Sequence, residues 1–190
     1  MEKIARICWN TNGWVSPSGR DGKVLSSGNY ENDKGFGHEE WLLDRSKIYK
    51  GYHYGYLECM NKTCHYDKEY DIHIFTINPQ KQRVYIGCLR KAKGVGVKES
   101  KEVYKHYANK GWLRLMKEDV LNAKASVVEF NALKPEDLFN VKFKFDLAEI
   151  DLPNLRIIKR ESIGHKYRYK SLMNKDFEFE FELNEKINRL

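Results

Sequence analysis

The sequence predicts an α+β fold in which a curved or barrel-like, mostly antiparallel sheet has helices packed at its sides. Apolar and polar residues alternate with period two at 52–57, 71–77 and 177–183, which is typical of half-buried strands. Residues 100–123 instead place apolar residues at helical spacing. Strands come before, between and after the helices, and a short turn joins two of them as an antiparallel hairpin, so an α+β domain is expected.

The amino-terminal part predicts a strand, a long loop and a short helix. In the strand at 2–9, Ile7 and Trp9 share one face. Residues 10–34 are rich in Gly, Ser, Asn and Asp and predict a loop, and a loop of this length is usually functional or disordered. Residues 38–48 predict a helix, and 52–57 a strand with a tyrosine face.

The middle of the chain predicts a hairpin and a broken helix. Residues 71–77 and 83–89 form the hairpin around the turn 78–81. Gly111 divides the helical stretch into two, because glycine is unfavourable inside a helix. A further helix begins at Lys134-Pro135, and strands are expected at 141–147, 155–158 and 177–183. No clear linker interrupts the chain, so we expect residues 1–190 to form one domain.

Composition favours a soluble nucleic-acid-binding protein. The formal charge of +7 suits a polyanionic partner, and the aromatic content of 13% supplies rings on which bases stack. No apolar run is long enough for a membrane span, so no membrane partner is expected. The first residues lack a signal-peptide pattern, which predicts a cytoplasmic location with reduced thiols.

The first 45 residues contain the candidate binding pocket. Three of the four tryptophans lie there, among amide and hydroxyl side chains, and a flat aromatic wall beside such groups suits a base. The alternative is a tryptophan-anchored loop packed on the core. The candidate pocket residues are Trp9, Asn10, Thr11, Asn12, Trp14, Ser16, Ser18, His38, Glu39 and Trp41.

Basic residues around the hairpin and near the carboxyl end form a candidate phosphate-binding surface. In the second group they alternate with tyrosines, as in surfaces that follow a phosphate backbone. The candidates are Arg83, Arg90, Lys91, Lys93, Lys166, Arg168 and Lys170.

The sequence contains no complete catalytic or metal-binding motif. The HEEW segment at 38–41 lacks the second histidine of a zinc protease, because Leu42 stands four residues after His38. Cys59, Cys64 and His65 have no second ligand pair, so free cysteines are expected and no metal or cofactor is implied.

The segments WNTNGWVSPSG and GFGHEEWL, with the hairpin IHIFTINPQKQRVYIGCLRKA, resemble EVE-like modules of the PUA superfamily. Such modules begin modification-dependent restriction proteins fused to HNH nucleases or McrBC-type motors. The resemblance implies a small barrel that flips a modified base into an aromatic pocket. The usual serine-glutamate-proline at the end of the first strand is replaced here by Trp9-Asn10-Thr11.

Together these observations predict a DNA-binding module that reads a modified base in duplex DNA, with a fused or associated nuclease or NTPase motor and no catalysis of its own. One alternative is a metal-dependent nuclease, for which Asp67, Glu69, Asp71 and Arg90 are candidates. A second alternative is a PUA-like RNA-binding module.

Overall fold

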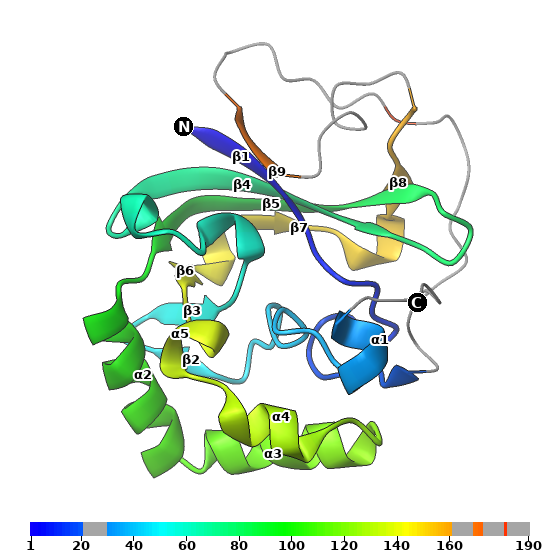
Figure 1. Ribbon diagram of the computed structural model, residues 1–190. Helices are drawn as coiled ribbons and strands as arrows, with labels where there is room; N and C mark the ends of the chain where they lie inside the picture. Colours follow the sequence, from blue (N-terminus) through cyan, green and yellow to red (C-terminus); the bar gives the residue numbers. More distant parts are fainter. Residues whose placement is uncertain (21–29, 161–168, 173–180, 182–190) are drawn as a thin grey trace.

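The computed structural model describes residues 1–20, 30–160, 169–172 and 181, without the side chains of Asn32 and of 169–172. The described residues form an α+β structure built on a mixed sheet (Figure 1). The strands are β1 (Glu2–Arg6), β2 (Ile48–Tyr49), β3 (Tyr52–Gly55), β4 (Glu69–Ile77), β5 (Arg83–Gly94), β6 (Val141–Phe143), β7 (Ala148–Ile150), β8 (Arg156–Ile157) and β9 (Tyr169–Leu172). The helices are α1 (Tyr30–Lys34), α2 (Val97–Asn109), α3 (Trp112–Asn122), α4 (Val127–Ala132) and α5 (Pro135–Leu138).

The sheet follows the order β2-β3-β6-β5-β4-β1-β9, with β7 and β8 also paired to β5. The two ends of this path, β2 and β9, do not pair with each other among the described residues. The expected closed barrel is therefore wrong: the sheet is curved but open. It is also mixed, because β1 and β4 run parallel while its other pairs are antiparallel.

The long strand β5 pairs with other strands along both of its edges. It pairs with β4 along its length, and β8, β7 and β6 meet its other edge in succession. Gly87 permits the close approach of β7, because a Cβ there would lie 2.1 Å from the carbonyl oxygen of Glu149. The predicted hairpin is confirmed by the β4–β5 pairing, which also shows register shifts typical of bulges.

Two large apolar clusters stabilise the structure. The first lies on the sheet and includes Ile72, Ile86 and Trp14. The second lies between the helices and the segment that enters β3, and it includes Tyr107 and Phe139. Figure 1 shows α2, α3 and α4 together on one side of β2 and β3, away from β1 and β4.

The helical region follows the prediction closely. α2 and α3 are separated at Gly111, whose φ of +73° is left-handed and suits glycine. The helix predicted at 38–48 is wrong, since the described backbone there forms turns. The Leu43 N–H donates to the Trp14 carbonyl at 2.9 Å and so does not bond within a helix of its own segment.

Candidate functional site

The polar side chains of the amino-terminal loop bind one another. The Asn10 amide, which is fully buried, donates to Glu40 Oε1 at 2.6 Å and to the Ser16 carbonyl at 2.8 Å. Its oxygen accepts from the backbone N–H groups of Asn12 and Trp14. The Asn12 side chain in turn donates to the Pro17 carbonyl at 2.8 Å. These amides therefore hold the loop in shape.

Trp14 lies in the core. Its side chain is fully buried in the apolar cluster on the sheet, and its indole Nε1 donates to the Cys8 carbonyl at 2.9 Å. Trp9 is half-buried and packs on the same cluster, whereas Thr11 and Asn12 are exposed. This part of the predicted pocket therefore has the structure of a tryptophan-anchored loop.

The turn at 37–44 carries side chains toward two different sites. The Glu40 carboxylate, fully buried, accepts from the backbone N–H groups of Ser18 at 3.1 Å and Gly37 at 2.9 Å, in addition to Asn10. Glu39 is half-buried. His38 and Trp41 instead line a cavity on the side of the helices. Of the predicted pocket residues, these two meet at a concave site.

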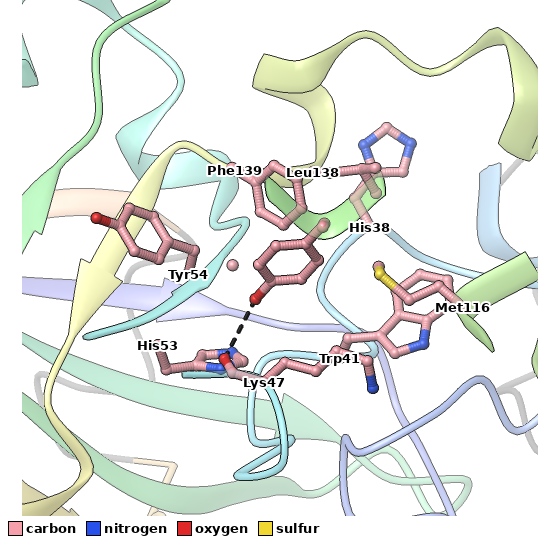
Figure 2. A pocket seen from close by; sticks show the side chains of 10 residues that line it. His38, Trp41, Lys47, His53, Tyr54, Met116, Leu138 and Phe139 are labelled. Atoms are coloured by element: carbon pink, nitrogen blue, oxygen red, sulfur yellow. Dashed lines mark hydrogen bonds between the residues drawn. The ribbon is translucent and has the colours of Figure 1, made fainter. Parts of the chain in front are cut away.

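An aromatic cavity lies between β3, the 37–47 segment and the helices (Figure 2). The space open to the centre of a water molecule is about 10 Å³, which is room for about one water. The cavity is lined by His38, Trp41, Lys47, His53, Tyr54, Gly55, Tyr107, Met116, Leu138 and Phe139.

His53 is the unusual member of this lining. It is 1% exposed, and neither ring nitrogen has a hydrogen-bond partner among the described residues. Burial lowers the pKa of His53 to about 4, although the Asp44 carboxylate and the nearby backbone of Lys47 and Trp41 act in the opposite direction. Those backbone groups lie near the ring but outside hydrogen-bonding geometry. At neutral pH His53 is therefore a neutral imidazole with one unused donor and one unused acceptor.

The other polar groups around the cavity are anchored. The Trp41 indole donates to Asp119 Oδ2 at 3.0 Å, and the Tyr107 hydroxyl donates to the Lys47 carbonyl at 3.3 Å (Figure 2). Lys47 itself pairs with the Asp44 carboxylate. His38 resembles His53, because its buried Nε2 has no partner among the described residues and burial lowers its pKa. The cavity thus combines fixed aromatic walls with two unsatisfied imidazoles.

Most of the predicted phosphate-binding residues that the structure describes already have partners. Arg90 binds Glu149 through two nitrogens and Asp71 through one, at 2.9–3.1 Å. Burial alone would raise the pKa of Asp71, but the Lys91 N–H and the Arg90 guanidinium lower it. Lys93 pairs with Glu69 at 3.5 Å.

The remaining predicted phosphate ligands are scattered. Arg83 lies over the Phe75 ring, and the Lys91 side chain is exposed. Lys170 stands opposite Ile4 in the β1–β9 pair. Lys166 and Arg168 lie outside the described residues. The hairpin charges thus form a network with the acidic residues beside them, and they do not gather into one surface.

A second concavity lies on the outer side of β5, with a volume of about 380 Å³. Its rim carries the acidic residues Glu149 and Asp151 and the guanidinium of Arg156, which stacks 3.8 Å from the centre of the Phe181 ring. Glu149 is bound to Arg90, and Asp151 accepts from the Asn154 amide. This open, charged groove offers no unsatisfied buried group among its described lining residues.

Comparison of the chain with models of known families, with curated proteins and with solved structures finds no match. Among the described residues, no group of three or more His, Cys, Asp or Glu side chains is placed to hold a metal ion. None of the four cysteines is in a disulfide. None of the described helices is long and apolar enough to cross a membrane.

Sequence reasoning missed several cavity residues. His53, Tyr107 and Phe139 come from β3, α2 and the segment after α5, which are far apart in the chain. One signal was available for His53: it alternates with tyrosines in a strand, so it shares a face with Leu57, which is fully buried. A histidine on the apolar face of a strand is a candidate for a specific role.

Proposed function

We propose that this chain is a nucleic-acid-binding module that receives one base, extruded from duplex DNA, in the aromatic cavity. The observation that carries the proposal is His53, a fully buried imidazole with two unused ring nitrogens on an aromatic cavity. A buried polar group without a partner costs about 1–3 kcal/mol, so a ligand that satisfies it gains a comparable amount. Stacking on the aromatic walls adds roughly 1–3 kcal/mol.

The neutral state of His53 matches the chemistry of a base. A neutral imidazole offers one donor and one acceptor, which suits the mixed donor and acceptor edge of a base. A cationic ring would instead offer two donors and would favour an anion. Since burial holds the pKa of His53 at about 4, the neutral form predominates at neutral pH.

Entry of a base requires the cavity to open, because its present space suits about one water. We assign the movement to the turn that carries His38 and Trp41, since this turn forms one wall and contains no regular helix or strand. Extrusion itself costs a few kcal/mol. The free energies gained by satisfying His53 and by stacking on the aromatic walls are of the same size as this cost. A small additional contact to a modified base therefore decides whether the flipped state forms.

The resemblance to EVE-like modules supports the same proposal at the level of family. It extends the proposal to a restriction system in which a nuclease or NTPase motor acts on DNA that this module has recognised. The HEEW segment is the most specific part of that resemblance, and its Glu40 accepts a hydrogen bond from Asn10 in the WNTNGW segment. RNA is the alternative ligand, and the experiment below includes it.

The test is a binding screen with a matched pair of variants. Wild-type protein is titrated with duplexes of one sequence that carry cytosine, 5-methylcytosine, 5-hydroxymethylcytosine or N6-methyladenine, and with the corresponding RNA. We expect one modified duplex to bind at least tenfold more tightly than the unmodified one. His53→Leu should remove this preference and leave the affinity for unmodified duplex unchanged, whereas His65→Leu, at a half-buried histidine outside the cavity, should keep the preference.

His53→Leu also separates binding from folding. Because the substitution removes an unsatisfied polar group from an apolar site, the variant should be about as stable as the wild type. Equal affinity of the wild type for every duplex would overturn the proposal that the protein recognises a modified base. Tighter binding of the RNA than of every duplex would transfer the proposal to RNA.

A further inference from the structure

The outer face of α2 carries three lysines in a row. Val103 and Tyr107 on the opposite face are buried, and Tyr107 lines the aromatic cavity. Lys98, Lys101 and Lys105 are spaced three and four residues apart, so they lie on one face of the helix, and all three are exposed. We call these three residues the α2 lysine row.

These three lysines differ from the paired basic residues of the hairpin. Among the described residues, no ion pair involves Lys98, Lys101 or Lys105. By contrast, Arg90 and Lys93 on the hairpin are paired with carboxylates. Next to the row, the Glu99 carboxylate is held by Lys142 at 2.7 Å and by the Tyr54 hydroxyl at 2.8 Å. Three unpaired positive charges therefore lie together on one face of α2.

The surroundings of the row also suit a nucleic acid. Figure 1 places α2 at the margin of the molecule, with no other described element over its outer side. Beside the row, Tyr49 stacks on His106 with 4.0 Å between ring centres. Lys50, which pairs with Glu102 at 4.0 Å, lies 5.0 Å from the centre of the Tyr49 ring. Half-buried aromatics next to unpaired lysines are typical of surfaces that hold a nucleic-acid strand.

We propose that the α2 lysine row binds the phosphate backbone of duplex DNA. This inference rests on the proposed function and adds the surface that holds the backbone. Seven residues separate Lys98 from Lys105, a rise of about 10 Å along the helix. One DNA strand presents a phosphate every ~3.4 Å of duplex axis, so the row spans about three phosphates.

The test compares two variants of equal net charge. The row variant is K98Q/K101Q/K105Q, and the control K62Q/K68Q/K81Q changes three exposed lysines that lie outside α2 and have no ion pair among the described residues. Glutamine is uncharged, one atom shorter than lysine and a good helix former, so both variants should fold like the wild type, which circular dichroism checks. The dissociation constant of an unmodified 20-base-pair duplex is measured at several salt concentrations.

For the row variant, we expect the slope of log Kd against log salt to fall by about 2–3, since each neutralised phosphate contributes about 0.9. The control should keep the wild-type slope. Equal loss in both variants would show that only net charge matters and would overturn the role of the row. Row-dependent binding to phosphatidylserine vesicles that is tighter than binding to DNA would assign the row to a membrane and would likewise overturn it.

The two proposals fail in different ways. Absence of duplex binding by the wild type at low salt would overturn both. Wild-type binding that the row variant retains in full, with its slope unchanged, would overturn only the row and leave the cavity as the site of base recognition.

Discussion

The buried carboxylate of Glu40 should be the most sensitive single point of the amino-terminal loop. Its Oε1 accepts from the Asn10 amide and the Ser18 N–H, and its Oε2 accepts from the Gly37 N–H. In Glu40→Gln, one of these positions becomes an NH₂ group that faces a buried donor. If that position is next to Gly37, an N–H group loses its partner at a cost of about 1–3 kcal/mol.

The two remaining hydrogen bonds also weaken, because charged acceptors contribute about 1.5–3 kcal/mol and neutral ones about 0.5–1.5 kcal/mol. The total destabilisation of Glu40→Gln is then about 3–5 kcal/mol, or roughly 6–20 °C in melting temperature for a chain of this size. Urea unfolding followed by circular dichroism measures it. Glu118→Gln is the control, since Glu118 is half-exposed and pairs only across one helical turn. A Glu40→Gln variant within about 1 kcal/mol of the wild type would refute the reasoning.

Two further predictions concern single buried rings. Trp14→Phe should lower the free energy of unfolding by about 2–3 kcal/mol, because it removes the buried hydrogen bond from the indole to the Cys8 carbonyl. The half-buried Trp112→Phe, measured in the same urea series, should cost less. Burial lowers the pKa of His53 from 6.5 to about 4. The contribution of the neutral His53 ring to the free energy of unfolding is therefore complete above pH 6.5 and falls by about 3 kcal/mol as the pH decreases to 4. His53→Leu should remove that part of the acid sensitivity, and an unchanged pH profile of stability would count against a neutral buried ring.

Local patterns in the sequence determined much of the fold. The alternation at 71–77 and 83–89 located β4 and β5, and the helical stretch with Gly111 located α2 and α3. Pairings between distant segments were not predictable in this way. The parallel pairing of β1 with β4, which leaves the sheet mixed and open, depends on contacts between residues about 70 positions apart.

The helix predicted at 38–48 shows the same limit. Its apolar spacing was compatible with a helix, but the turn there bonds to the first loop through Leu43 and Glu40, which no local pattern reveals. For the same reason, the residues of the predicted pocket belong to two separate sites in the structure. Asn10 and Trp14 became internal parts of the loop, because Glu40 lies beneath them, whereas His38 and Trp41 reached the cavity on the other side.

The arrangement around residues 37–44 links these observations. One turn directs Glu40 into the polar network of the first loop and directs His38 and Trp41 into the cavity. Trp41 is also tied to α3 through Asp119, and α2 contributes Tyr107 to the cavity and lysines to the outer surface. If the turn moves when a base enters, Glu40 and Asp119 are the groups that resist it. Glu40→Gln should therefore alter base preference as well as stability, whereas a loss of stability alone would indicate that the loop and the cavity act independently.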